Sequence, residues 1–299
     1  MNLQELRYFA AVVEYRHFGR AAEACNVSQP TLSSQLRKLE DELGVTLLER
    51  TNKRVDLTPV GRQILEHAQR ALAETAQIES VARAARDPLV GALRLGVIPT
   101  LAPYLLPLIF GPLQKSYPGL AIELWEDQTR PLLEGLRSHR LDAALIASPT
   151  GSPIGSSELT EVPLFAEPLL AALPPNHALA ARKTVDESAL APDLLVMADG
   201  HCLANHSLAA CGAKAGLQSA MQAATLETLV NLVAAGYGTT LIPSLAATSL
   251  AHRGVELRPL TQNSTRTIRL ASRPGFPRPQ ALRAIEKVVR RAVPQSWRQ

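Results

Sequence analysis

The stretch FGRAAEACNVSQPTLSSQLRKLEDELGVTLLER, residues 18–50, decides the fold of the N-terminal part of this chain. Its opening, residues 19–25, is typical of a short helix. After a two-residue break, Ser28 offers an N-cap and Pro30 occupies the first turn of a second helix, where a missing N–H does no harm. Gly44 ends that helix. Its apolar residues recur at helical spacing: Leu32, Leu36, Leu39 and Leu43.

A polar face runs along this second helix, opposite the leucines. Its members are Gln29, Pro30, Thr31, Ser33, Ser34, Arg37 and Lys38. Most of these side chains are of the types that contact base edges and phosphates in DNA complexes. A short helix, a tight turn and a polar-faced helix match a helix-turn-helix motif. The residues alone leave an alternative open, a small helical bundle with a solvated polar face.

The residues after this motif predict a β-hairpin wing. The segment LLERTNKRVDLT, residues 47–58, alternates in character and contains a turn, which places Arg50, Lys53 and Arg54 at the tip. Residues 1–58 hold eight basic and eight acidic side chains, so their bulk charge is zero. The prediction of DNA binding therefore depends on where the charges lie and not on their sum.

A long helix is expected next, with Thr58 as its N-cap and Pro59 in its first turn, ending near Arg86. Its apolar stripe follows a spacing close to the heptad repeat: Val60, Ile64, Ala68, Ala71, Thr75, Ile78 and Ala82. A lone helix has no surface of its own against which to bury such a stripe. We expect a linker that pairs with a second copy of the chain; packing on the C-terminal domain is the alternative.

The remainder of the chain alternates strands and helices. Strands are expected at 92–100, 120–127 and 141–147, with helices that begin after Thr100 and at Thr129. This order favours a parallel sheet covered by helices, which binds ligands beyond the C-terminal ends of its strands. Both threonines lie at such ends, where free N–H groups favour polar or anionic guests. Simple helix capping is the alternative role for them.

Further elements extend this α/β pattern. The segment 161–175 predicts two strands around Pro163 and Pro168. The later segments predict strands at 193–197, 239–243 and 266–272 and helices at 224–236 and 280–293.

Length and composition limit the possible classes of protein. The chain has 299 residues, enough for two or three domains, and a net charge of +4, a weak indication of an anionic partner. Its start does not match a signal peptide, and no apolar run is long enough to span a bilayer. We therefore expect no membrane association and a cytoplasmic location, where thiols are kept reduced.

The segment Phe18–Arg50 resembles the DNA-binding domain of LysR-type transcriptional regulators almost continuously. The C-terminal pattern is similar to the effector domain of that family, which is related to periplasmic binding proteins. The resemblance covers the whole chain. It implies an α/β fold class with a winged helix-turn-helix at 1–58, a linker and dimerisation helix at 59–88 and a two-lobed effector domain at 89–299. Lobe I would comprise 91–163 with 268–299, and lobe II 164–267.

The segment ADGHCLANHSLAACG holds two of the three cysteines, Cys202 and Cys211. Core packing is one interpretation, because free cysteine is often buried. A zinc site with His201 and His206 is another, although the spacing lacks the close pairs of zinc signatures. A reversible disulfide is the third. Metal binding is the least favoured of the three, and we expect neither a metal nor a cofactor.

Physical chemistry makes the reversible disulfide plausible. With Asp199 as an N-cap, Cys202 would lie in the first turn of a helix, where free N–H groups favour its thiolate and His201 adds hydrogen bonding or charge. If 202–211 is helical, the two Cα atoms are about 13.5 Å apart. A disulfide needs roughly 4.4–6.8 Å, so its formation would have to unfold this segment.

Around the cysteines the resemblance narrows to the peroxide-sensing members of the LysR type, through GHCL and the residues that flank it. It implies Cys202 as the peroxidatic thiol and Cys211 as the resolving thiol. It also implies His201 and Arg266 beside the thiol, with Thr100 and Thr129 holding peroxide and water. Ala204 departs from this pattern, because close relatives carry a basic residue there. Cys25, among alanines, is expected to be core packing.

The resemblance also implies partners: double-stranded promoter DNA, hydrogen peroxide, further copies of the chain in a homodimer or homotetramer, and RNA polymerase. Two other functions remain open. One is a LysR-type regulator that binds a small metabolite between its lobes and in which the cysteines are incidental. The other is a thiol peroxidase, which would leave the N-terminal 90 residues without a role. We expect a regulator and not an enzyme.

Overall fold

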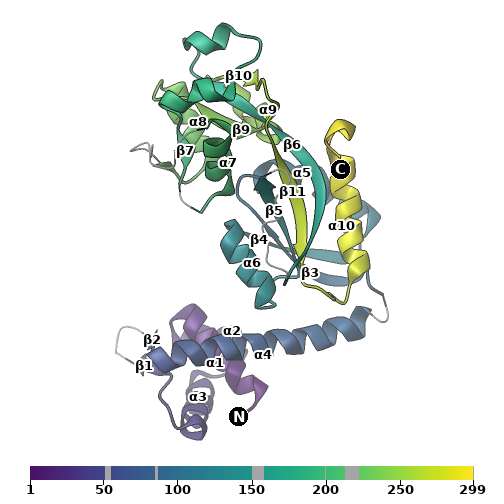
Figure 1. Ribbon diagram of the computed structural model, residues 1–299. Coiled ribbons are helices and arrows are strands. Elements are labelled where there is room, and N and C mark those ends of the chain that lie inside the picture. Colours follow the sequence, from purple (N-terminus) through teal and green to yellow (C-terminus); the bar gives the residue numbers. More distant parts are fainter. Residues whose placement is uncertain (51–54, 85–86, 150–157, 199, 213–221, 299) are drawn as a thin grey trace. The chain divides into compact units, whose positions relative to one another are not determined.

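The structure is a computed structural model that describes residues 1–50, 55–84, 87–149, 158–198, 200–212 and 222–298 (Figure 1). It divides into two compact units, Met1–Ala82 and Arg83–Gln299. None of the described helices is both long and apolar enough to cross a membrane.

The first unit is a winged helix-turn-helix, as predicted. Ser28 caps the second helix of the motif, Gln29–Leu43, by accepting from the Thr31 N–H at 3.3 Å, and Gly44 ends it in the left-handed region at a φ of +67°. The two wing strands pair antiparallel with Leu48 opposite Leu57. The elements are α1 (Leu3–Tyr15), α2 (Phe18–Ala24), α3 (Gln29–Leu43), β1 (Leu48–Arg50), β2 (Val55–Leu57) and α4 (Pro59–Ala84).

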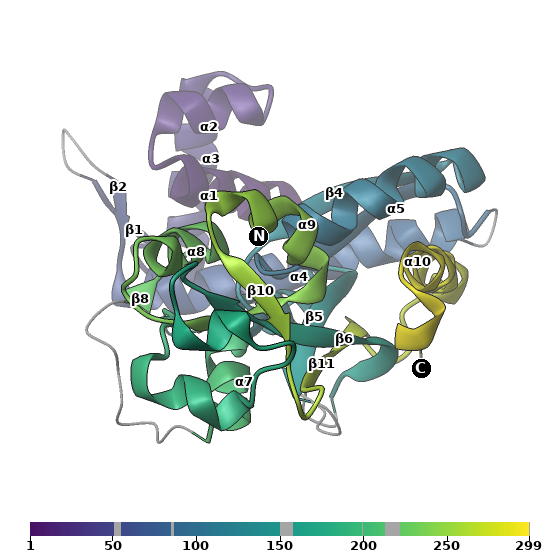
Figure 2. The ribbon, with the colours of Figure 1, turned by 90° about the horizontal axis from the view of Figure 1, so that it is seen from above.

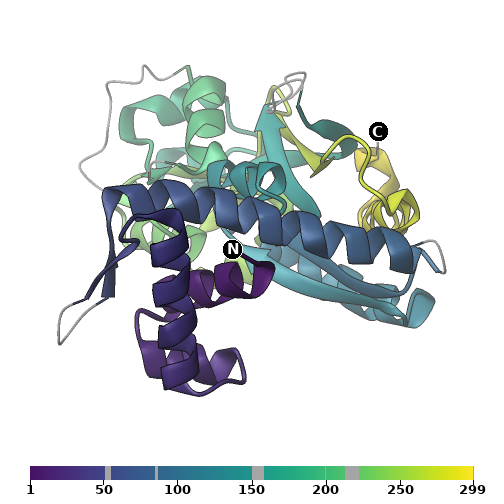
Figure 3. The ribbon, with the colours of Figure 1, turned by 90° about the horizontal axis from the view of Figure 1, so that it is seen from below.

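The stripe along α4 has two different environments. Thr58 caps the helix, accepting from the Gly61 N–H at 2.8 Å, as predicted. Near this end, Ile64 and Ala68 pack on the hydrophobic cluster of α1 and α3. Further along, Ile78 is 70% exposed. The first part of the stripe therefore packs in the core of its own unit, whereas Ile78, further along the single long helix α4 (Figure 3), is exposed.

The second unit is built on one seven-stranded sheet in the order β10-β6-β11-β5-β3-β4, with β9 also on β6. Its strands are β3 (Gly91–Val97), β4 (Leu120–Glu126), β5 (Ala143–Pro149), β6 (Thr160–Leu173), β9 (Thr240–Pro243), β10 (Glu256–Pro259) and β11 (Thr265–Ser272), with the short pair β7 (Val196–Met197) and β8 (Gln222–Ala223) apart. Its α-helices are α5 (Ala102–Ser116), α6 (Thr129–Arg137), α7 (Cys202–Ala210), α8 (Leu226–Ala234), α9 (Ala247–Leu250) and α10 (Pro279–Ala292). Its 3-10 helices are η1 (Ala178–Ala181), η2 (Glu187–Asp193), η3 (Ser244–Ala246), η4 (Ala251–Arg253) and η5 (Gln295–Trp297).

The sheet is mixed, and only part of it is parallel. Strand β3 pairs parallel with β4 and β5, as the alternation of strands and helices predicted. Strand β11 pairs antiparallel with both β5 and β6. Seen from the front and from above, α7 and α10 lie on different sides of β6 (Figures 1 and 2).

The prediction of two strands around Pro163 and Pro168 was wrong, because β6 is one strand of 14 residues. Both prolines lie where the strand tolerates a lost N–H donor. The register of β6 against β11 shifts at Pro163, and the pairing with β11 ends at Pro168. From Leu169 onward, β6 pairs with β9 and β10 instead. Strand β6 thereby runs from one lobe of the unit into the other.

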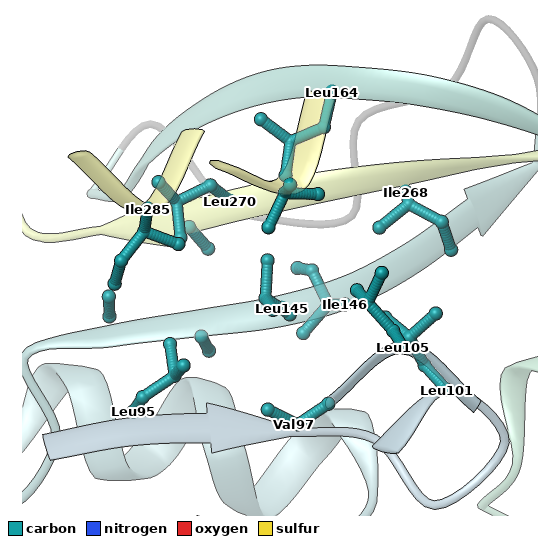
Figure 4. Packing of buried hydrophobic residues seen from close by; sticks show 14 of the residues in the cluster. Leu95, Val97, Leu101, Leu105, Leu145, Ile146, Leu164, Ile268, Leu270 and Ile285 are labelled. Atoms are coloured by element: carbon teal, nitrogen blue, oxygen red, sulfur yellow. The ribbon is translucent and has the colours of Figure 1, made fainter. Parts of the chain in front are cut away.

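Each lobe of the unit has its own hydrophobic cluster. In lobe I, Leu95, Leu145, Ile268 and Ile285 pack between the sheet, α5 and α10 (Figure 4). In lobe II a separate cluster gathers residues of β7, α7, α8 and β9, including Cys211. We use lobe I and lobe II below for the parts that surround these two clusters.

Candidate functional site

The candidate redox site lies at the start of α7. The helix begins at Cys202, and His201 is its N-cap, without a side-chain capping bond. The prediction that Asp199 caps this helix was wrong, because the cap is His201; Asp199 itself lies outside the described residues. As the first helical residue, Cys202 lies where free N–H groups and the helix dipole favour negative charge.

The Cys202 thiol contacts the first residue of α6. Thr129 Oγ1 and Cys202 Sγ are 2.9 Å apart, with Thr129 buried and Cys202 half-buried. The adjacent loop is also close, because the end of the Gln128 side chain lies against Gly200, whose φ of +91° is a backbone conformation that other residues rarely adopt. Glycine adopts it without strain. The starts of two helices, one in each lobe, therefore form the site.

His206, one turn along α7, contacts the backbone of the same cysteine. Its Nδ1 lies 2.5 Å from the Cys202 carbonyl oxygen. Burial lowers the pKa of His206 and the Arg266 charge adds to this, whereas the backbones of Ser148 and Cys202 oppose it. The imidazole is therefore neutral at neutral pH and donates from Nδ1.

Arg266 is completely buried and belongs to an ion-pair network behind the site. Its Nε donates to Glu167 Oε2 at 2.9 Å, and its Nη2 lies 2.8 Å from the same oxygen in an ion pair. Its Nη1 donates to Thr100 Oγ1 at 2.8 Å, and Nη2 to the Thr100 carbonyl at 3.0 Å. Glu167 also accepts the Leu245 N–H at 2.8 Å. The charge of Arg266 is thus paired with a buried carboxylate, and it also acts on the nearby ring of His206.

His201 is buried beside Cys202, and that burial lowers its pKa. It is therefore neutral at neutral pH. Of the two contributions expected from the sequence, hydrogen bonding and charge, burial therefore disfavours the charge.

Cys211 is the C-cap of α7, and its N–H donates to the Ser207 carbonyl at 3.0 Å. The side chain is 2% exposed, and burial, with a smaller contribution from the Glu187 charge, raises the pKa of the thiol to about 12. The helical rise places the two cysteines about 13.5 Å apart. Cys211 is thus a protonated thiol at the far end of the helix from Cys202.

The separation of Cys202 and Cys211 along α7 argues against a zinc ion that both would ligate. Two residues at opposite ends of one helix do not ligate one ion, since Zn–S and Zn–N bonds are about 2.0–2.3 Å long. Within the described ranges, no three His, Cys, Asp or Glu side chains are grouped as metal ligands.

The structure brings some predicted residues together and adds others. Thr129 meets Cys202 directly, whereas Thr100 and Arg266 meet each other. Two contributors were missed: His206, considered only as a zinc ligand, and Glu167. An acidic residue inside the apolar run PLFAEPLLAAL was a signal that a buried charge needed a partner.

The candidate DNA interface is the exposed face of α3. The side chains of Gln29, Pro30, Thr31, Ser34, Arg37 and Lys38 are exposed, and Ser33 is half-buried. The Arg50 backbone belongs to β1, and Lys53 and Arg54 lie outside the described residues. The predicted residues of α3 thus lie on its exposed side, and Arg50 belongs to the wing strand β1.

Lys38 has intramolecular partners on this face. Its Nζ lies 3.2 Å from Glu5 Oε1 and 3.6 Å from Glu42 Oε1, and Glu5 is completely buried. The hydrogen bond that Lys38 donates to Glu5 and the charges of both carboxylates raise the pKa of Lys38. Lys38 therefore compensates a buried carboxylate, which its place on the polar face did not reveal.

A winged helix-turn-helix joined to a two-lobed α/β unit defines a DNA-binding regulator whose second unit receives a signal. The chain belongs to the LysR family: the family model described as bacterial regulatory helix-turn-helix protein, lysR family, matches residues 3–62, and that of the LysR substrate binding domain matches residues 86–294.

Individual relatives are similar over nearly the full length. The chain is 43% identical to the hydrogen peroxide-inducible genes activator of Haemophilus influenzae, over 93% of this chain and 92% of the relative. It is 44% identical to the DNA-binding transcriptional dual regulator OxyR of Escherichia coli, over 93% of this chain and 91% of the relative.

Solved structures give the same picture. A full-length OxyR from Pseudomonas aeruginosa with a cysteine replaced by aspartate matches at a TM-score of 0.75 and 36% identity, over 97% of this chain and 98% of that one. A hydrogen-peroxide-bound mutant of Corynebacterium glutamicum OxyR matches at 0.65 and 34%, over 97% and 92%.

Proposed function

We propose that this chain is a DNA-binding transcriptional regulator that senses hydrogen peroxide through Cys202 and a reversible Cys202–Cys211 disulfide. The observation that carries the proposal is the thiol at the first position of α7, 2.9 Å from Thr129 Oγ1. The names of the similar proteins, hydrogen peroxide-inducible genes activators, support the signal molecule.

The first step oxidises Cys202. Its thiolate attacks one oxygen of hydrogen peroxide, the O–O bond breaks, and the sulfur becomes a sulfenic acid. The departing hydroxide takes up a proton and leaves as water. In the proposal Thr129 and Thr100 hold peroxide and water, and His201 hydrogen-bonds to them. Arg266, fixed by Glu167 and Thr100, stabilises the developing negative charge through its field.

The second step forms the disulfide. The Cys211 thiol loses its proton, its sulfur attacks the sulfur of the Cys202 sulfenic acid, and water leaves. The helical separation of about 13.5 Å exceeds the reach of a disulfide, roughly 4.4–6.8 Å between Cα atoms. The bond therefore forms only when α7 loses its helical structure, so a chemical event becomes a conformational one.

In the proposal the first unit binds promoter DNA. The proposal has Gln29, Pro30, Thr31, Ser33, Ser34 and Arg37 on promoter DNA, with Lys38 at the phosphate-facing end and Arg50, Lys53 and Arg54 on the wing. The exposed Ile78 supports pairing of α4 in a homodimer, two of which make a homotetramer. RNA polymerase is the partner through which transcription responds. The proposal also includes a cytoplasmic location, where thiols are kept reduced.

The domain division predicted from the sequence belongs to this proposal, with DNA binding at 1–58, the linker at 59–88 and sensing at 89–299. Ala204 is buried among the apolar residues of lobe II, which supports a site without a local cation at that position.

The test is thiol mapping by mass spectrometry on the full chain after one equivalent of peroxide, with a trap for sulfenic acid. We expect a trapped adduct on Cys202 in Cys211→Ser and a 202–211 disulfide in the wild type. Cys25→Ser is the matched control and should behave as the wild type. If Cys202→Ser responds to peroxide like the wild type, the proposal is wrong and a metabolite signal takes its place.

A further inference from the structure

His206 is a buried titratable group that the proposed redox chemistry does not use. It lies one turn after Cys202, and its side chain is 5% exposed. Helix α7 packs against β5, and the His206 ring lies near the backbone of Ser148 in that strand. The ring thus lies between the first turn of α7 in lobe II and the sheet of lobe I.

The hydrogen bond of His206 fixes its tautomer. A carbonyl oxygen only accepts, so the 2.5 Å contact with Cys202 requires a proton on Nδ1. In the neutral ring Nε2 then carries a lone pair, and this buried atom has no hydrogen-bond partner among the described residues. A second proton, on Nε2, would give a buried cation.

The surroundings of the ring oppose that second proton. From β11 the charge of Arg266, although paired with the Glu167 carboxylate, acts on the ring and lowers its pKa. From β5 it faces the uncharged backbone of Ser148, which favours protonation but has a smaller effect on the pKa than burial, the largest cause of its lowering. From its own helix it faces Cys202, and His201, the other histidine at this end, is also buried.

We propose that His206 is a positioning residue that couples the folded state of α7 to the redox site, and that its protonation links the disulfide equilibrium to acidity. The inference rests on the proposed function, because it assumes that the 202–211 disulfide unfolds α7. In the reduced protein His206 is buried, neutral and bonded to the Cys202 carbonyl. In the disulfide form it leaves this place and gains access to water.

The proton balance follows from the two environments. On release, the pKa of His206 rises from its lowered value towards the ordinary value of about 6.5. Between these two values the disulfide form holds a proton on His206 that the reduced form lacks. Reduction by two glutathione thiols breaks the protein disulfide, forms glutathione disulfide and, in this range, releases that proton. Acidity therefore favours the protein disulfide.

The experiment equilibrates full-length protein with the glutathione couple between about pH 5 and pH 8, compared with His206→Gln. Glutamine keeps an N–H for the Cys202 carbonyl and does not titrate. For each protein the experiment gives an equilibrium constant for thiol–disulfide exchange with glutathione. We expect the ratio of the wild-type constant to the His206→Gln constant not to change with pH above about pH 6.5. Below it, the wild type should shift towards the disulfide by up to tenfold for each pH unit.

Two further variants separate titration from packing. His177→Gln, which removes a histidine outside α7, should follow the wild type at every pH. His206→Ala removes both bond and titration, and should favour the disulfide at all pH values. A ratio of wild type to His206→Gln that is constant throughout, or a divergence removed by His201→Gln instead, overturns the inference.

A measurement on the wild type alone also tests whether His206 titrates differently in the reduced and oxidised forms. NMR of histidine-labelled wild type should show His206 titrating at a lower pH in the reduced than in the oxidised protein, and equal titration overturns the inference. The proposed function fails separately, if peroxide produces no 202–211 disulfide at any pH.

Discussion

Cys202 and Cys211 lie at opposite ends of α7, Cys202 as its first residue and Cys211 as its C-cap. The first thiol is half-buried and touches Thr129 of lobe I, whereas the second is buried in the cluster of lobe II. This asymmetry sets the order of the proposed chemistry. The accessible thiol reacts with peroxide, and the buried one becomes available only when the helix opens.

Thr129→Val should slow the oxidation of Cys202. The substitution keeps the shape and removes the hydroxyl 2.9 Å from the sulfur. A hydrogen bond contributes about 0.5–1.5 kcal/mol, so the rate of sulfenic acid formation should fall roughly two- to tenfold. Stopped-flow measurement with Thr75→Val, a threonine on α4, as the control checks this. An unchanged rate would show that the hydroxyl plays no part in the step.

Glu167→Ala should strongly destabilise the second unit. It leaves the completely buried Arg266 without its counter-charge, a loss that typically costs about 3–5 kcal/mol in the free energy of unfolding. Glu134→Ala breaks an exposed pair with Arg130 and should cost less than about 1 kcal/mol. Urea unfolding of both variants provides the comparison; equal losses would mean that Glu167 does not compensate Arg266.

Arg37→Ala should weaken DNA binding. Because one phosphate contact is lost, the slope of the logarithm of the binding constant against the logarithm of the salt concentration should become shallower by about one. Arg37 is exposed on α3, and no ion pair of this side chain is found within the described ranges. Lys38→Ala should, in addition, lower the stability of the first unit, because it uncovers the buried Glu5. Arg130→Ala in the other unit serves as control. An unchanged salt slope would remove Arg37 from the interface.

Ile78→Asp should abolish dimers while both units stay folded. Ile78 is 70% exposed in the single chain, so a charge there costs little until a partner covers it. Ile64→Asp is the contrasting variant. Since Ile64 packs on the cluster of its own unit, it should unfold that unit as well. Sedimentation with circular dichroism separates the two effects, and dimers that persist in Ile78→Asp would place the interface elsewhere.

Alkaline pH should destabilise the reduced protein through Cys211. Burial raises the pKa of Cys211 to about 12, whereas an exposed thiol has about 8.5. The stability gained from burying the protonated thiol is complete below about pH 8.5. It is lost as the pH rises towards 12, by up to about 1.4 kcal/mol per unit. Urea unfolding in reductant should show this loss in the wild type and not in Cys211→Ser. A parallel pH dependence in the two proteins would contradict the assignment.

The elements that follow from local patterns could be predicted from the sequence. Leucine spacing, Ser28 and Gly44 together specify α3, because caps and periodicity are local properties. The parallel part of the sheet follows from the alternation of strands and helices. The continuity of β6 could not be predicted in this way. Pro163 and Pro168 are strand breakers unless the register shift and the exchange of partners are known.

The site shows the same limit. Cys202, Thr129, Thr100 and Arg266 could be named from motifs, but not which of them touch. The pairing of Arg266 with Glu167 joins residues from two strands, and the pairing of Lys38 with Glu5 joins two helices. Such contacts depend on tertiary structure, which neither charge pattern nor spacing encodes locally.

The central claim is that oxidation of Cys202 opens α7. Hydrogen exchange of the amides of residues 203–210, measured by mass spectrometry before and after one equivalent of peroxide, tests it most directly. The account predicts that these amides lose protection in the wild type, together with formation of the 202–211 disulfide, and keep it in Cys211→Ser. A disulfide that forms while residues 203–210 remain protected would contradict the account.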